Sequence, residues 1–250
     1  MQVGPKSTHI SADPLLVREP RWTTGSVGNV TPENEISIRP LFATPLLVFT
    51  VVDHRRINAE LSRLILERET SQPSYSDDEV VGWSSPHDLS MLEWAADPLE
   101  LLLGQVTQVA TCMTELSERS SLHARQPEWR VAELWANVQR KGGSNACHPH
   151  PGSFWSGVYY IDVGDVSQGA NGGELQLYDP RGCLPRMLAP YLRYSVPELH
   201  DAGASVSFTP SAGQCLLFPG WLFHAVTRYT GNAPRISIAF NLDPIIHKGS

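Results

Sequence analysis

The chain has few cysteines and no run of apolar residues long enough to cross a membrane. Its four cysteines are far apart and form no CxxC pair: Cys112, Cys147, Cys183 and Cys215. This spacing does not resemble a zinc site and favours reduced thiols. The first residues also lack the apolar segment of a secretory signal. We therefore expect a cytoplasmic protein with no membrane partner.

Positive charge is also scarce. The sequence has 19 Lys and Arg against 26 Asp and Glu, which gives a formal net charge of -7. An acidic chain repels a phosphate backbone, and no cluster of Lys and Arg forms a local basic patch. We predict that nucleic acid is not a partner. The oligomeric state stays open, with a homodimer among the options.

The composition suits one domain, since 41% of the 250 residues are hydrophobic. Residues 1–35 are polar with scattered Pro and Gly, and they predict a flexible arm or a lid. Residues 36–250 predict a single domain. It begins with a strand or two in residues 36–52, followed by helical support at about 53–120 and a barrel core at about 130–243.

Two segments have the apolar period of a helix. Asp53 is the expected N-cap of the first, whose apolar face holds Ile57, Leu61, Leu64 and Ile65. In the second, Asp97 is the expected N-cap and Pro98 the first helical residue. Its apolar stripe is Leu99, Leu102, Leu103, Val106, Ala110, Met113 and Leu116. Such stripes usually pack against a core, so both helices are expected to lie on a sheet.

After about residue 130 the sequence changes to short β-rich runs: VAELWANV, FWSGVYYID, ELQLY, QCLLF and RISIAFN. Gly, Pro and Asn separate these runs, as is typical of turns. Several short strands with such turns predict a sandwich or a barrel. The expected fold class is therefore mainly β with flanking helices.

Three histidines stand near the ends of these runs. His148 and His150 are two residues apart in CHPHP, and residues two apart on a strand point to the same face. Imidazole is a ligand for iron, zinc, copper or nickel. Two nearby histidines alone are more often surface residues. His224 follows the apolar strand and Pro-Gly turn of LLFPGWLFH, however, and a barrel can bring it beside the other two.

The last run, RISIAFN, has one apolar face and one polar face. The polar face presents the guanidinium of Arg235 and the hydroxyl of Ser237. A half-exposed strand with a solvated arginine would give the same pattern. Eleven residues after a candidate metal histidine, a carboxylate clamp is the sharper hypothesis, because guanidinium binds carboxylate through two parallel hydrogen bonds.

The order of these motifs resembles the iron(II)/2-oxoglutarate-dependent oxygenase superfamily, in its prolyl-hydroxylase-like branch. The motifs are His-x-His, a strand with Tyr-Tyr, GGEL, GxxLLFP, a further His and Arg-x-Ser. HPHPGSFWSGVYYID, LYDPRG and LLFPGWLFHAVTRYTGNAPRISIAFN are closest to a bacterial and phage family of 2-oxoglutarate-Fe(II) oxygenases. Weaker similarity in PLFATPLLVF, INAEL and VGWSS extends the resemblance over most of residues 38–242. It implies a double-stranded β-helix, or jelly-roll, barrel.

The resemblance also implies iron(II), 2-oxoglutarate and dioxygen as cofactors. His148 would be the proximal metal ligand and His224 the distal one. Arg235 would anchor the far carboxylate of 2-oxoglutarate, assisted by Ser237. Three more positions match 2-oxoglutarate or substrate contacts in such enzymes: Asn137, Gln139 and Tyr160.

The third metal ligand departs from the superfamily. Its usual motif is His-x-Asp or His-x-Glu, whereas this chain has His150 at the acidic position. His150 is the favoured ligand. A carboxylate from Asp162 or Asp179 is the alternative, although these residues are typical of a strand end and a turn. An open coordination position is least favoured, because imidazole is too large to leave a gap.

The expected reaction is hydroxylation, or another oxidation, of an unactivated C–H bond, with succinate and CO2 as co-products. A small molecule, such as an amino acid or a natural-product intermediate, is the favoured substrate, and a peptide or protein residue is the alternative. The arm and the 181–206 insertion are the expected specificity elements. Three aromatic residues belong either to the substrate mouth or to the core: Trp155, Trp221 and Phe223.

Two other functions stay open. A three-histidine cupin-type dioxygenase would not use 2-oxoglutarate, and it would need no arginine clamp. A jelly-roll binding module would have no redox chemistry at all, and the fold alone does not exclude it.

Overall fold

The computed structural model describes five stretches of the chain: residues 42–75, 80–117, 126–168, 171–182 and 205–245. The arm at residues 1–35 and most of the 181–206 insertion lie outside the described residues, so what the sequence predicts for them stays a prediction. The described strands form two antiparallel sheets.

The larger sheet has six strands in the order β1-β9-β6-β11-β4-β3. Their bounds are Leu47–Thr50 for β1, Gln214–Pro219 for β9, Trp155–Asp162 for β6, Arg235–Pro244 for β11, Trp129–Gln139 for β4 and Trp83–Ser84 for β3. Four of the five predicted β-rich runs are the four longest strands of this sheet, and β1 lies in the predicted 36–52 segment. The two-residue β3 is too short to give a period, and it was not predicted.

The smaller sheet has five strands in the order β2-β5-β10-β7-β8. Their bounds are Val80–Val81 for β2, Ser144–His148 for β5, His224–Val226 for β10, Leu175–Tyr178 for β7 and Ser205–Phe208 for β8. The two sheets pack face to face, since one buried cluster contains residues of both: Tyr160, Leu175, Leu177, Leu216 and Phe218. The predicted mainly-β jelly-roll class is confirmed.

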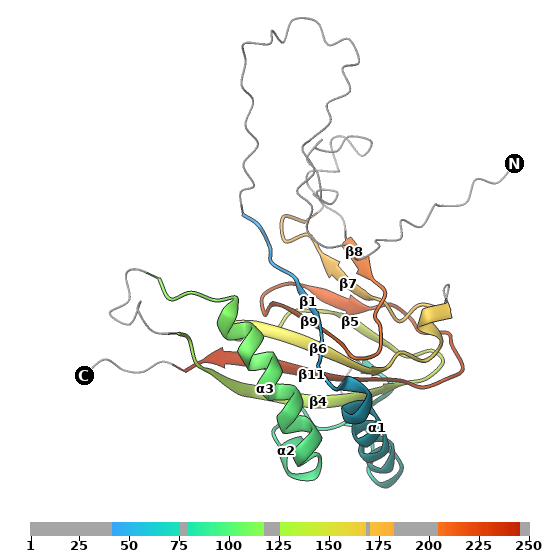
Figure 1. The fold of residues 1–250 in the computed structure, drawn as a ribbon. Helices are drawn as coiled ribbons and strands as arrows, with labels where there is room; N and C mark the ends of the chain where they lie inside the picture. The colour runs from blue at the N-terminus through green and yellow to red at the C-terminus, as the bar shows by residue number, and fades with distance from the viewer. Residues whose placement is uncertain (1–41, 76–79, 118–125, 169–170, 183–204, 246–250) are drawn as a thin grey trace, which may run out of the picture. The chain divides into compact units, whose positions relative to one another are not determined.

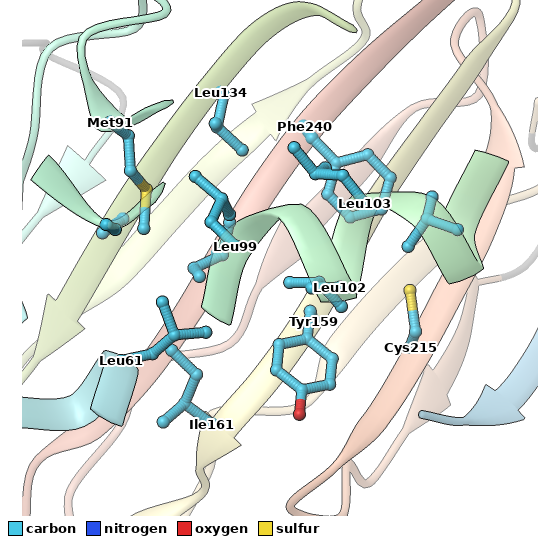
Figure 2. Close-up of a cluster of buried hydrophobic side chains, with 14 of the residues drawn as sticks. Leu61, Met91, Leu99, Leu102, Leu103, Leu134, Tyr159, Ile161, Cys215 and Phe240 are labelled. Carbon is cyan, nitrogen blue, oxygen red and sulfur yellow. The ribbon is translucent and has the colours of Figure 1, made fainter. Parts of the chain in front are cut away.

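Two long helices, α1 (His54–Ser71) and α3 (Ala96–Cys112), cover one face of the six-stranded sheet (Figure 1). The short α2 (Met91–Trp94) precedes α3. In Figure 2, Leu102 and Leu103 of α3 lie over the sheet residues Tyr159 and Phe240, and all four belong to one buried cluster. Burying one such leucine stabilises the fold by roughly 1.5–3 kcal/mol. The helices are therefore packing elements, as their apolar stripes predicted.

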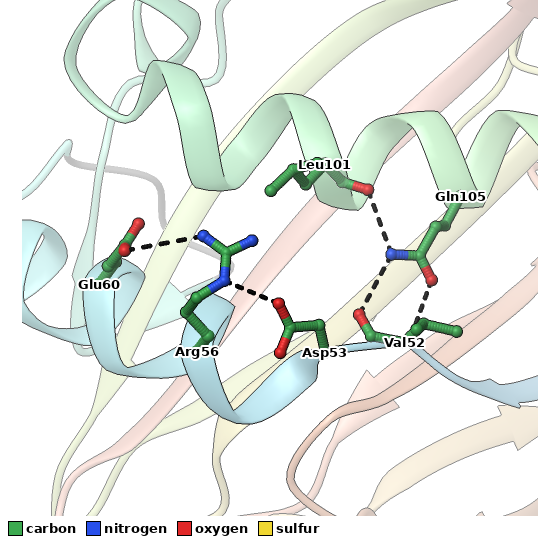
Figure 3. A network of polar contacts seen from close by, with 6 residues as sticks. All are labelled: Val52, Asp53, Arg56, Glu60, Leu101 and Gln105. Atoms are coloured by element: carbon green, nitrogen blue, oxygen red, sulfur yellow. Dashed lines mark hydrogen bonds and ion pairs between the residues drawn. The ribbon is translucent and has the colours of Figure 1, made fainter.

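The predicted N-cap position is correct for α1 and wrong for α3. Asp53 stands at the N-cap of α1, but its side chain makes no cap hydrogen bond and instead accepts one from Arg56 Nε at 2.7 Å (Figure 3). The helix α3 begins at Ala96, so Asp97 and Pro98 lie within its first turn. A proline is tolerated there because the first-turn N–H groups have no helical partner. Met113 follows the end of α3 and is exposed.

Two exclusions made from the sequence can be examined in the described residues. Cys112, Cys147 and Cys215 are free thiols, as predicted, and Cys183 lies outside the described residues. Among the described helices, none is long and apolar enough to span a membrane.

Candidate metal and cofactor site

Three imidazoles converge at one end of the five-stranded sheet. His148 ends β5 and His224 begins β10, and the two are direct partners in the antiparallel ladder. His150 lies beyond β5, in a turn held by a 2.7 Å hydrogen bond from its N–H to the carbonyl of Gly220. The turn, and not a shared strand face, therefore brings His150 to the pair. One ligand atom from each histidine lies within 4.8 Å of the others.

Backbone carbonyls orient two of these rings. His148 Nδ1 is 2.7 Å from the carbonyl of Ala146, and His224 Nδ1 is 2.9 Å from that of Leu222. A carbonyl oxygen only accepts, so each Nδ1 carries the hydrogen and Nε2 keeps its lone pair for a metal. Among the described residues, neither ring nitrogen of His150 makes a hydrogen bond, and its ring meets Trp135 edge-on at 5.6 Å. Only His148 and His224 are thus anchored.

Burial lowers the pKa of two of these imidazoles, His150 and His224. Burial, with the neighbouring imidazoles, lowers the pKa of His150 to about 3. Burial, with His148 nearby, lowers the pKa of His224 to about 4. Neutral imidazole is the form that binds a metal ion. At neutral pH the two side chains are therefore in the metal-binding form.

Arg235, the first residue of β11, is a buried cation that is only partly hydrogen-bonded. It is 1% exposed, so the solvated arginine allowed by the sequence does not occur. Its Nη1 donates to Gln139 Oε1 at 2.7 Å and lies 3.5 Å from Ser237 Oγ, whereas Nε and Nη2 have no hydrogen-bond partner among the residues that the structure describes. Burial lowers its pKa, but a guanidinium stays charged in proteins. Two unpaired donors on a buried charge suit an anion that offers paired oxygens.

The other predicted cofactor residues surround Arg235 because of strand register. Gln139 is the cross-strand partner of Arg235, and Asn137 that of Ser237. Tyr160 of β6 pairs with Ser237 from the other side, and its ring lies 5.1 Å from the guanidinium carbon of Arg235. Burial raises the pKa of Tyr160 to about 12, so its hydroxyl stays protonated. Within the described part of the chain, that hydroxyl and Asn137 Oδ1 are buried without a hydrogen-bond partner.

One cavity joins the histidines to the guanidinium. Seven of the eight predicted site residues line it: Asn137, His148, His150, Tyr160, His224, Arg235 and Ser237. Gln139 is fully buried and does not line it. The lining residues that sequence reasoning missed include Trp135 and Asn145. The period of two along β4 could have found Trp135, which shares a strand face with Asn137.

Neither carboxylate proposed as an alternative ligand is at this cavity. Asp162 is exposed, and its Oδ1 accepts the N–H of Gly164 at 2.8 Å. Asp179 is paired with Arg181 at 2.8 Å. Among the described residues, no Asp or Glu lines the cavity. His150 is thus the described side chain best placed to join His148 and His224.

The three aromatic residues predicted for either the substrate mouth or the core fall into two groups. Trp155 is buried in the core beneath the helices, where its Nε1 donates to Thr114 Oγ1 at 3.0 Å. Trp221 and Phe223 are half-exposed and flank the buried Leu222. None of the three lines the cavity.

Comparison with known proteins gives one family match. Residues 133–241 match the family described as "Putative 2OG-Fe(II) oxygenase", the kind of enzyme that the sequence motifs resemble. A Trichoplax adhaerens prolyl hydroxylase, solved with a hypoxia inducible factor peptide fragment, is similar at 13% identity and a TM-score of 0.51, over 78% of this chain and 83% of that one. A Pseudomonas putida prolyl-4-hydroxylase is similar at 12% identity and a TM-score of 0.49, over 78% and 91%. No curated protein matches the chain.

Proposed function

We propose that this chain, a 2OG-Fe(II) oxygenase over its matched residues 133–241, hydroxylates an unactivated C–H bond of a small molecule. The cofactors of this enzyme family are iron(II), 2-oxoglutarate and dioxygen. A single observation carries the proposal: one cavity holds three converging imidazoles and a fully buried guanidinium with two unpaired donors.

The residues fit the cofactors. His148, His150 and His224 would hold iron(II), because imidazole suits this metal and the three ligand atoms are within 4.8 Å of one another. Arg235 would bind the distal carboxylate of 2-oxoglutarate through Nε and Nη2, the two nitrogens left unpaired. The Tyr160 hydroxyl, buried beside Arg235 without a partner, can donate to the same carboxylate.

When bound, these cofactors supply the oxidation, in which 2-oxoglutarate becomes succinate and CO2 as a substrate C–H bond is hydroxylated. The chain's own residues have other tasks. The backbone carbonyls of Ala146 and Leu222 hold two imidazoles in the tautomer that binds through Nε2. Leu175, Phe218 and Val226 give the cavity apolar walls that exclude water around the reacting groups.

The substrate is proposed to be a small molecule, such as an amino acid or a natural-product intermediate. A peptide is the alternative, and the Trichoplax adhaerens hydroxylase in complex with a peptide favours it. At 13% identity that likeness extends only to the fold. A panel of amino acids, peptides and secondary metabolites distinguishes the two classes.

The test is conversion of 2-oxoglutarate to succinate with added iron(II), followed by mass spectrometry. Iron-dependent succinate formation that a panel compound stimulates, with that compound gaining one oxygen atom, is the expected result. Oxygen consumption without any use of 2-oxoglutarate would favour the three-histidine cupin-type dioxygenase instead. If iron(II) binds and neither oxygen nor 2-oxoglutarate is consumed with any compound, the binding-module reading gains and the proposal is abandoned.

A further inference from the structure

Gln139 lies behind Arg235 and away from the cavity. It is completely buried and does not line the cavity, whereas Arg235 and Asn145 do. Its Oε1 accepts the 2.7 Å hydrogen bond from Arg235 Nη1, and its Nε2 donates to Asn145 Oδ1. Gln139 is therefore placed to act on Arg235 and not on a ligand.

The direction of these hydrogen bonds follows from Arg235. A guanidinium can only donate, so Gln139 must turn its amide oxygen toward it. The amide NH2 of Gln139 then faces Asn145, which offers its own oxygen. This series of hydrogen bonds runs from Arg235 on β11 through Gln139 on β4 to Asn145 on β5, and so links the two sheets. One nitrogen of Arg235 is thereby fixed while Nε and Nη2 stay available.

Arg235 differs from other arginines of the described chain because its hydrogen-bond partner is neutral. Several of these pair with a carboxylate: Arg56, Arg63, Arg130, Arg140 and Arg181. All five have at least half of the side chain exposed, and Arg235 is buried with an amide as its strongest contact. A buried charge normally has a counter-charge. Here the described residues do not supply one, so a ligand must.

We propose that Gln139 is a positioning residue that reserves Arg235 for the distal carboxylate of 2-oxoglutarate. Its neutral amide fixes the guanidinium without neutralising it, so the whole charge remains for the ligand. Gln139 thus determines specificity for a co-substrate with a second carboxylate over one with an uncharged end. The inference rests on the proposed function, because it takes 2-oxoglutarate as the ligand of this cavity.

The decisive variant is Gln139→Glu, which keeps the size of the side chain and adds a carboxylate beside Arg235. Calorimetry on manganese-loaded protein would compare 2-oxoglutarate with 2-oxopentanoate, which has a methyl group in place of the distal carboxylate. The Kd for 2-oxopentanoate divided by the Kd for 2-oxoglutarate should fall by about 30-fold or more. This is the lower end of the effect of losing a buried charge partner. The Kd for manganese should not change. A merely structural role would weaken both ligands together.

Gln105→Glu is the matched control. Gln105 lies on α3, and its Oε1 accepts a hydrogen bond from the N–H of Val52 at 2.7 Å (Figure 3). It does not line the cavity. The same chemical change at this position should leave the ratio unaltered. Gln139→Met, which removes the anchor without adding charge, guards against misfolding of the glutamate variant. This variant too should bind 2-oxoglutarate more weakly, with no change in its binding of 2-oxopentanoate.

The outcomes separate the two proposals. Wild-type binding of 2-oxoglutarate, unchanged in folded Gln139→Glu or Gln139→Met, overturns the role of Gln139 and leaves the proposed function intact. A wild-type protein that binds manganese and no 2-oxoglutarate defeats the proposed function, and this inference falls with it.

Discussion

Replacing Arg235 with methionine should weaken 2-oxoglutarate binding strongly, with little effect on the stability of the empty protein. Methionine fills similar space and carries no charge. Two effects oppose each other in the empty protein. The desolvation cost of a 1% exposed guanidinium disappears, while Gln139 Oε1 loses the donor it now has at 2.7 Å. Leaving that acceptor unpaired costs about 1–3 kcal/mol. The net change in unfolding free energy should therefore be small.

The effect on the ligand is much larger. Losing a buried, charge-assisted contact costs on the order of 2–5 kcal/mol, or roughly 30- to several thousand-fold in Kd. At a 2-oxoglutarate concentration about 100 times its Kd, binding stabilises the wild type by roughly 2.7 kcal/mol. For a chain of this size that raises the melting temperature by about 5–10 °C. A variant whose Kd rises about 100-fold gains only about 0.4 kcal/mol, or roughly 1–2 °C.

Thermal melting of the manganese-loaded protein, with and without 2-oxoglutarate, measures both quantities. Arg235→Lys should recover only part of the shift, because an ammonium group cannot present two parallel donors. A full shift in Arg235→Met would refute the assignment of the clamp. So would a full shift with lysine, since the planar fork would then be irrelevant.

The remaining predictions concern the metal and the shape of the cavity. His148→Ala and His224→Ala should abolish iron binding, because backbone carbonyls orient both of these rings. His150→Ala should leave measurable but weaker binding, because the ring of His150 lacks such a carbonyl. Equal losses in a metal titration would contradict this. Gly173 has φ +84°, and an added Cβ would lie 2.8 Å from Val166 Cγ2 and 3.3 Å from Arg235 Cδ. Gly173→Ala should therefore destabilise the protein by about 1–3 kcal/mol and weaken 2-oxoglutarate more than manganese, which melting and calorimetry test; an unchanged melting temperature would exclude the strain.

The shared face of Arg235 and Ser237 could be predicted from the sequence because β11 has a strict period of two. Alternation alone placed Arg235 and Ser237 on one face and the apolar residues on the other, and the structure has both sets buried. The other long strands were predicted from their β-rich composition and from the Gly, Pro and Asn residues that separate them. Local pattern suffices wherever a strand is long enough to repeat.

The metal end depended on information that the local pattern does not contain. His224 and His148 become neighbours through the pairing of β10 with β5, which lie far apart in the chain. His150 reaches them from a turn held by Gly220, and no strand period describes a turn. Asn145 gave no signal, because its role depends on the amide of Gln139 opposite. Here the resemblance of motifs, and not periodicity, supplied the prediction.

The histidine end and the Arg235 end of the proposed cofactor site belong to different sheets. Substitutions at the two ends should therefore have separable effects on ligand binding. His148 and His224 come from the five-stranded sheet, and Arg235 comes from the six-stranded sheet. The sheets meet where Phe218 packs against the ring of His224, with centroids 4.8 Å apart. On the proposed function, a metal ion would need only the first sheet and its adjoining turn, whereas 2-oxoglutarate would span both. Changes behind Arg235 should therefore alter co-substrate affinity and leave the metal in place, as the Gln139 and Gly173 variants are designed to test.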